Sequence, residues 1–152
     1  LENARIKARA AHELACAAVL ADDSGLIVDA LDGAPGVYSS RYSGVDGDDS
    51  ANNAKLLREL SAVPLAKRTA RFASVLVFID EDGLETVAEG FVEGHIGLVE
   101  RGEHGFGYDP LFFPDAYNGE VTMAELTQSQ KNAISHRGNA LRELRKKLHA
   151  CD

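Results

Sequence analysis

The middle of the chain contains two long strand-forming segments joined by a three-residue turn. Residues 69–80 are rich in Val, Phe and Ile, and residues 84–96 return as a second strand. The turn between them, Glu-Asp-Gly at residues 81–83, is a hairpin signal. Because hairpin strands run antiparallel, a purely parallel sheet is excluded. Gly90 and Gly94 in the second strand indicate bulges or places where another backbone comes close.

Three segments have the patterns of helices. Residues 2–17 are predicted to form a helix capped by Asn3, and the second is predicted from the capping residues 48–50 to about residue 61. The third is predicted over residues 130–149. The predicted core faces are Ile6, Ala10, Leu14 and Ala17; Leu56, Leu57 and Leu60; and Ala140, Leu141, Leu144 and Leu148.

An acidic stretch with the sequence Ala-Asp-Asp-Ser-Gly-Leu occupies residues 21–26, between apolar runs at 17–20 and 26–31. Apolar runs of this length are typical of buried strands, so the two carboxylates are expected at a strand end. Oxygen-rich strand ends suit a hard cation such as Mg²⁺. The alternative is an ordinary tight turn, because Asp, Ser and Gly are common turn residues.

Two further stretches carry side chains that suit a nucleotide. Residues 102–110 interleave glycines with Phe106 and Tyr108; aromatic faces stack nucleobases, and glycine lets a backbone come close. The alternative for these rings is packing in the core. Lys131, His136 and Arg137 gather near the start of the last predicted helix, where they suit an anion or form a solvated basic face. Carboxylates, Mg²⁺ and basic residues together indicate a metal-dependent nucleotide-processing enzyme.

Composition narrows the class of protein and its partners. A length of 152 residues suits one domain, residues 1–152, and a net charge of −8 argues against a nucleic-acid-coating surface. The longest apolar run, residues 75–79, is far too short for a membrane span, and no signal peptide opens the chain. Cys16 and Cys151 form no disulfide framework and no metal-ligand spacing. These features fit a reducing cytoplasm.

Five stretches, in this order along the chain, resemble the inosine triphosphate pyrophosphatase family of XTP/dITP diphosphatases. The matching stretches are residues 2–8, 21–26, 33–44, 105–110 and 131–138. The resemblance implies an α/β fold, elongated, with a long twisted mixed β-sheet flanked by helices. It also implies a homodimer that uses Mg²⁺ to hydrolyse non-canonical purine nucleoside triphosphates to the monophosphate and pyrophosphate.

The resemblance implies a role for each matching polar or aromatic residue. Asp23 would be the general base or the metal ligand, Ser24 would contact substrate, and Lys7 would reach the triphosphate. The base pocket would be formed by Phe106, Gly107, Tyr108 and Asp109. The base or a phosphate would be recognised by Lys131, His136 and Arg137. A donor aimed at the 6-keto group would meet an amino group in adenine, and such buried mismatches discriminate strongly.

The start of the chain departs from this family pattern. Family members begin with a strand, a Thr-x-Asn-x-x-Lys phosphate loop and a metal-binding glutamate, and none of these precedes Leu1. We therefore expect a family member truncated at its N-terminus, which lacks phosphate ligands, one metal carboxylate and part of the sheet. A sheet edge bared in this way favours pairing with another chain. The alternative functions are a Maf-like nucleotide pyrophosphatase, a nucleotide-binding module without catalysis, and a structural protein.

Overall fold

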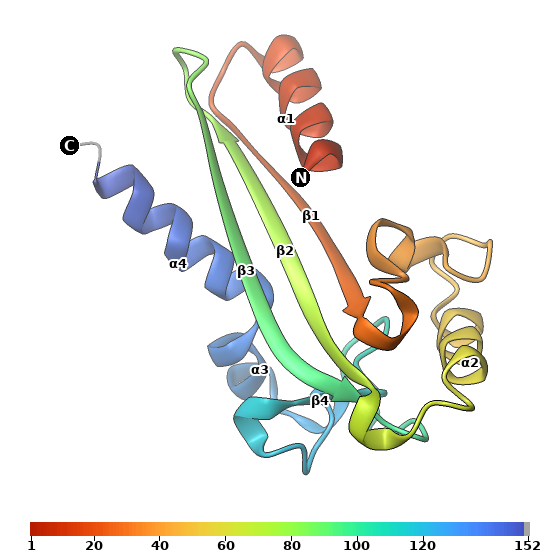
Figure 1. Cartoon of the computed structure of the whole chain (residues 1–152). Coiled ribbons are helices and arrows are strands. Elements are labelled where there is room, and N and C mark those ends of the chain that lie inside the picture. The colour runs from red at the N-terminus through yellow and green to blue at the C-terminus, as the bar shows by residue number, and fades with distance from the viewer. Residues whose placement is uncertain (151–152) are drawn as a thin grey trace. The chain divides into compact units, whose positions relative to one another are not determined.

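The structure, a computed structural model, describes residues 1–150 and places four strands in one sheet in the order β1-β2-β3-β4 (Figure 1). The strands are β1 (Val19–Val28), β2 (Thr69–Ile79), β3 (Glu85–Ile96) and β4 (Phe112–Pro114). The helices are α1 (Glu2–Ala15), α2 (Asp49–Glu59), α3 (Gln128–Ile134) and α4 (His136–His149). Successive strands run in opposite directions, and β4 pairs antiparallel with β3. The predicted α/β fold with helices flanking a sheet is confirmed.

The chain divides into two compact units. The first unit consists of residues 1–24, 73–91 and those from 135 onward, and the second consists of residues 25–72 and 92–134. Strands β1, β2 and β3 each contribute residues to both units. One domain over residues 1–152 stays a prediction, because compact units that share strands can belong to one domain or to two.

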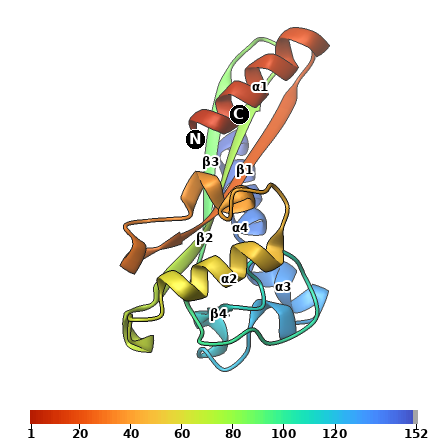
Figure 2. The same cartoon turned by 90° about the vertical axis from the view of Figure 1, so that its right-hand side faces the viewer.

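In the first unit, helices cover both faces of the sheet. One cluster of buried side chains joins α1 to β2: Ala4, Ala8, Val77 and Ile79. A second cluster joins α4 to the β2–β3 hairpin: Leu76, Ala88, Ala140 and Leu144. Leu76 and Val77 are neighbours in β2, and neighbouring side chains of a strand point to opposite faces. Helices α1 and α4 therefore pack on opposite faces of this part of the sheet (Figure 2).

The buried face of α1 differs from the predicted one. Ala4 and Ala8 are fully buried, whereas Leu14 is 89% exposed and Ile6 is also exposed. The predicted face is offset from the buried one by two residues, which corresponds to about 200° around a helix. Two small side chains one turn apart let α1 lie close against the strands, and larger residues at these positions would hold it away. Small residues, rather than large apolar ones, thus mark this face.

The observed ends of the helices also differ from the predicted ones. The N-cap residue of α1 is Leu1, and Asn3 lies inside the helix, so the predicted Asn3 cap is wrong. The helix predicted over residues 130–149 is broken at Ser135, whose hydroxyl accepts a hydrogen bond from the backbone N–H of Gly138 at 3.1 Å. A serine that caps the following helix interrupts the preceding one, because the N-cap residue takes non-helical backbone angles.

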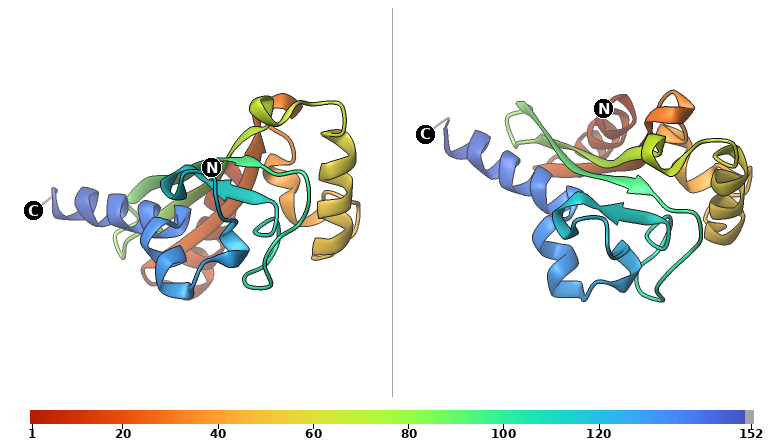
Figure 3. Two further views of the ribbon diagram at one scale, coloured as in Figure 1. Left: turned by 90° about the horizontal axis from the view of Figure 1, so that it is seen from below. Right: turned by 60° about the horizontal axis from the view of Figure 1, so that its bottom comes forward.

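In the second unit, α2 packs its leucines against residues from β1, β2 and β3. Leu56 and Leu60 are fully buried, as predicted, and the Asp48 side chain caps α2 by accepting from Ala51 N at 3.0 Å. The core around them includes Leu26, Val28, Phe72, Val92, Ile96, Tyr108, Leu111 and Phe112. Figure 3 shows β4 alongside β3, where His95 pairs with Phe113.

The two glycines of β3 lie where another backbone comes close, as predicted. A Cβ atom on Gly94 would be 2.2 Å from Phe113 O, and one on Gly90 would be 2.2 Å from Ala140 N of α4. The hairpin turn is confirmed as well, since Gly83 N donates to Asp80 O at 3.1 Å. Among residues 1–150, no helix has the length and apolar character needed to cross a membrane.

Candidate active site

The acidic stretch lies within a strand and not at a strand end. Residues 22–25 are in the middle of β1, which runs without interruption from residue 19 to residue 28. The predicted strand end and the alternative of a tight turn are therefore both wrong. The predicted continuation of the second run as a strand is also wrong, because residues 29–31 form a 3-10 helix. β1 pairs with β2 in the sheet, and this tertiary contact outweighs the local turn preference of Asp, Ser and Gly.

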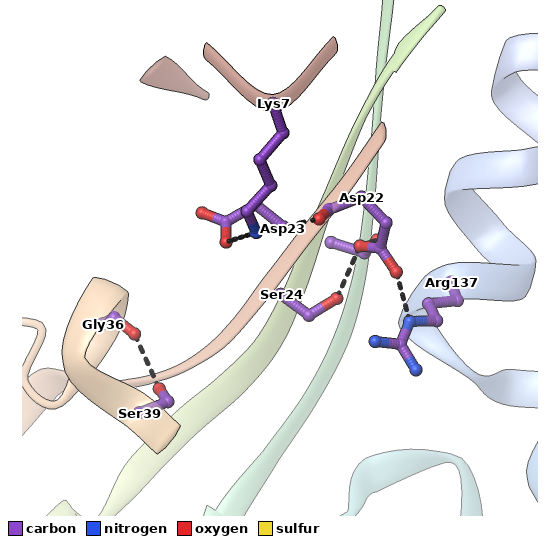
Figure 4. A network of polar contacts seen from close by, with 8 residues as sticks. Lys7, Asp22, Asp23, Ser24, Gly36, Ser39 and Arg137 are labelled. Carbon is purple, nitrogen blue, oxygen red and sulfur yellow. Dashed lines mark hydrogen bonds and ion pairs between the residues drawn. The ribbon is translucent and has the colours of Figure 1, made fainter. Parts of the chain in front are cut away.

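Strand geometry gives the two aspartates different surroundings. Asp23 Oδ1 lies 3.2 Å from Lys7 Nζ of α1, whereas Asp22 forms an ion pair with Arg137 of α4 (Figure 4). This follows from the alternation of side chains along β1, since α1 and α4 cover opposite faces. The two carboxylates do not form a pair on one face. Each one instead has its own cationic partner.

Asp22 is the centre of a hydrogen-bond network within the first unit. Its carboxylate accepts from Ser24 Oγ at 3.0 Å and from Ser74 Oγ at 3.1 Å, in addition to Arg137 Nε. Ser74 is fully buried in β2 and was not among the predicted site residues. A lone serine within the apolar run of residues 72–79 is the sequence signal that could have revealed it. Asp22 accepts from three donors, whereas Asp23 accepts only from Lys7 among the described residues, so Asp23 keeps more free acceptor capacity.

Asp23 offers one carboxylate that could bind a metal ion, if a phosphorylated ligand supplied the other oxygens. Among residues 1–150, no group of three or more His, Cys, Asp or Glu side chains is arranged to hold a metal ion. Mg²⁺ commonly binds one or two carboxylates and completes its shell with substrate phosphates and water. The single carboxylate of Asp23, partly exposed beside Lys7, fits that pattern.

In the second unit, the glycine-rich loop wraps around the carboxylate of Asp109. Asp109 Oδ2 forms an ion pair with Lys131 and accepts from Phe106 N at 3.1 Å. Lys131 Nζ also lies 4.7 Å from the centre of the Phe106 ring, a cation–π contact. Gly105 has a φ of +84°, and a Cβ atom there would be 2.2 Å from Asp109 Oδ2, so any side chain at this position is strained. A largely buried charge of this kind needs its partner.

The two aromatic side chains of this loop have different environments. Phe106 is 64% exposed, whereas Tyr108 is 5% exposed and its hydroxyl donates to Ser39 O at 2.7 Å. Burial, reinforced by the nearby Tyr42 and Asp49, raises the pKa of Tyr108 above its ordinary value. The Ser39 hydroxyl in turn donates to Gly36 O at 2.6 Å. Of the two rings, Phe106 offers the face that can stack on a base.

The predicted cluster of Lys131, His136 and Arg137 does not occupy one helix start. Lys131 lies in α3 and pairs with Asp109 of the second unit. His136 is the first residue of α4, and Arg137 pairs with Asp22 of the first unit. The helix break at Ser135 is the physical reason for this division. Lys131 and Arg137 are thus each paired with a carboxylate.

Sequence comparisons match nearly the whole chain to known proteins. A model of the Ham1 family matches residues 1–147. The chain is 52% identical, over 149 residues, to a dITP/XTP pyrophosphatase of Oceanobacillus iheyensis. This alignment covers 97% of this chain and 74% of that protein. The chain is also 56% identical, over 146 residues, to a dITP/XTP pyrophosphatase of Nocardia farcinica. That alignment covers 94% of this chain and 68% of the Nocardia protein.

Solved structures give the same result. The Ham1 protein of Staphylococcus aureus superposes with a TM-score of 0.91 at 42% identity, over 99% of this chain and 77% of that one. A nucleoside-triphosphatase, or dITP/XTP pyrophosphatase, of Mycobacterium abscessus superposes with a TM-score of 0.82 at 49% identity, over 94% and 72%. A Maf-like protein is not favoured by these matches. The chain belongs to the Ham1 family.

Proposed function

We propose that this protein hydrolyses non-canonical purine nucleoside triphosphates, such as dITP and XTP, to the monophosphate and pyrophosphate. The observation that carries the proposal is the 52% identity, over nearly the whole chain, to a protein named dITP/XTP pyrophosphatase. The polar networks around Asp23 and Asp109 support it, because they supply groups suited to phosphate and to a base.

The proposed chemistry breaks the bond between the α-phosphorus and its bridging oxygen. A water oxygen forms the new bond to the α-phosphorus, and pyrophosphate leaves. Asp23 either accepts the proton of this water or holds Mg²⁺, and Lys7 balances negative charge on the phosphates. When bound, Mg²⁺ supplies further neutralisation of the phosphate charge and polarises the phosphoryl oxygens. Ser24 remains a proposed substrate contact, since its hydroxyl here donates to Asp22.

Base recognition is assigned mainly to the loop around Asp109. The exposed ring of Phe106 stacks on the purine, and Gly107, Tyr108 and Asp109 form the rest of the pocket. Lys131, His136 and Arg137 supply donors to the 6-keto group or to phosphate. Adenine presents an amino group at that position, so these donors face another donor and the substrate is rejected.

A panel of triphosphates tests the proposal. With Mg²⁺ present, ITP, dITP and XTP should yield the monophosphate and pyrophosphate with kcat/KM at least about 100-fold higher than for ATP or GTP. Chelation of Mg²⁺ should stop the release, and its addition should restore it. Calorimetry with ITP and Mg²⁺ distinguishes the alternatives: binding without release supports a non-catalytic nucleotide-binding module. Absence of both binding and release contradicts a nucleotide function.

The proposed setting of this enzyme is the cytoplasm, where purine triphosphates are made and used, and its proposed assembly is a homodimer. The composition supports the compartment, since neither of its two cysteines has the spacing of a disulfide framework. Sedimentation at micromolar concentration tests the assembly. A sedimentation coefficient that stays at the value of a 16.3 kDa monomer would contradict the dimer.

A further inference from the structure

Helix α2 binds both backbone groups of one residue in the aromatic loop. Asp49 Oδ2 accepts from Gly107 N at 2.7 Å, and Asn53 Nδ2 donates to Gly107 O at 3.1 Å. Asp49 and Asn53 are four residues apart, so they lie on the same face of the helix. One helix face thus holds the N–H and the C=O of a single glycine.

This glycine adjoins the exposed aromatic ring of Phe106. Gly107 directly follows Phe106 and has a φ of +59°, a conformation that residues with a side chain rarely adopt. The N–H that donates to Asp49 belongs to the peptide that joins Phe106 to Gly107. A rotation of this peptide would turn the exposed Phe106 ring. The two α2 side chains therefore restrain the ring face that is proposed to stack on the base.

The environment of Asn53 argues that its contact with the loop is more than packing. Asn53 is 3% exposed, and its Oδ1 atom is buried without a hydrogen-bond partner among the described residues. A buried acceptor without a partner destabilises a fold, and an apolar side chain at this position would avoid that penalty. Unlike an apolar residue, however, Asn53 donates a hydrogen bond to Gly107 O.

We propose that Asp49 and Asn53 are positioning residues that set base selectivity by holding Gly107, and with it the Phe106 ring, in the orientation that accepts a 6-keto purine. The inference rests on the proposed function, in which Phe106 stacks on the base. Neither residue touches the substrate. Both act through the loop, so their loss weakens selection of the base and leaves the phosphoryl chemistry in place.

Four variants test the inference. Asp49→Ala and Asn53→Ala each remove one bond to Gly107, whereas Asp49→Asn keeps an oxygen that can accept from Gly107 N. Asn52→Ala is the matched control, because Asn52 is the neighbouring buried asparagine. Its Oδ1 accepts from Ser43 N at 2.7 Å, and its Nδ2 donates to Ser40 O at 3.1 Å and Ser39 O at 3.5 Å and not to Gly107. The readouts are KM and kcat for dITP and dATP, together with the melting temperature of each variant.

Both alanine variants at the Gly107 contacts should raise KM for dITP, with kcat less affected. They should lower the ratio of kcat/KM for dITP to that for dATP by about tenfold, since a misplaced contact of about 1 Å can cost up to about 100-fold. Asp49→Asn should keep the ratio. Asn52→Ala should lower the melting temperature while it leaves the ratio within about twofold, because a merely structural role changes stability and not selectivity.

Two results would overturn the inference: an unchanged ratio in both alanine variants, or an equal loss of the ratio in Asn52→Ala. If Asn53→Ala does not fold, Asp49→Ala decides the question, because Asp49 is exposed and its removal opens no cavity. A wild-type protein that releases no pyrophosphate from dITP contradicts the proposed function instead. In that case, calorimetric affinities for ITP and ATP across the same variants measure the selectivity directly.

Discussion

At the scale of single residues, Gly90 shows how closely α4 packs on the sheet. A Cβ atom at this position of β3 would lie 2.2 Å from both Ala140 N and His136 O of α4. Both atoms belong to the helix backbone, which does not move aside as a side chain can. The contact between this strand and this helix therefore depends on the absence of a side chain.

The substitution Gly90→Ala should destabilise the protein by about 1–3 kcal/mol, the usual range for an overpacked site. Urea denaturation followed by circular dichroism measures the free energy of unfolding. The control is Glu89→Ala on the exposed face of the same strand, which should stay within about 0.5 kcal/mol of wild type. Equal stability of the two variants would mean that α4 does not pack on Gly90 in solution.

Some of these residue environments could be predicted from the sequence, and others could not. The close approach at Gly90 could be predicted, since a glycine inside a strand has few other uses. The separate partners of Asp22 and Asp23 could not, because they depend on which strand pairs with β1 and which helix covers each face. Likewise, nothing local distinguishes Phe106 from Tyr108, although only Tyr108 is buried.

At the scale of elements, α2 depends on the N-cap residue Asp48. Its side chain accepts from Ala51 N at 3.0 Å, which satisfies one of the unpaired N–H groups of the first turn. Asp48→Ala should therefore lower the free energy of unfolding by about 1 kcal/mol. Asp46→Ala, at another exposed aspartate of the same loop, is the control and should have little effect. If the two variants lose the same stability, the cap is not what stabilises α2.

A second prediction at this scale concerns the ion pairs between α1 and β3. Glu85 lies 2.6 Å from Arg5 and 3.3 Å from Arg9, and the hydrogen bond from Arg5 lowers the pKa of Glu85 below its ordinary value. A lowered carboxyl pKa in the folded state stabilises the protein above the unfolded pKa, near pH 4.3. That stability is lost as the pH falls through the lower, folded value.

The variant Glu85→Gln should thus be less stable than wild type at pH 7, by less than about 1 kcal/mol, as is usual for exposed ion pairs. The difference should shrink below about pH 4, since a protonated glutamate resembles glutamine. Unfolding free energies measured between pH 3 and pH 7 test this. A difference that is constant with pH would assign the effect to packing and not to charge.

Elements were predicted best where the pattern is long and local. The hairpin of β2 and β3 and the leucine face of α2 follow from residue type and spacing alone. The break at Ser135 was missed, because no proline separates the two helices and a serine between two helical segments does not by itself reveal an N-cap. The course of β1 through its acidic residues was missed for a different reason: strand pairing overrode local turn chemistry.

At the scale of the whole molecule, the residues proposed for chemistry and those proposed for base recognition belong to different compact units. Lys7 and Asp23 belong to the first unit, and Phe106 and Asp109 belong to the second. The family and its fold could be predicted from the order of five motifs along the chain, which no single motif would have justified. The division of their residues between two units depends on long-range contacts and became apparent only from the structure.

The central claim, that Asp23 serves hydrolysis of a non-canonical purine triphosphate, is tested most directly by pyrophosphate release from dITP with Mg²⁺. Wild type should release pyrophosphate and dIMP in equal amounts. Asp23→Asn should release them at least about 100-fold more slowly, the effect typical of losing a general base or a metal carboxylate. Equal rates for the two proteins, or no release by wild type, would contradict this account.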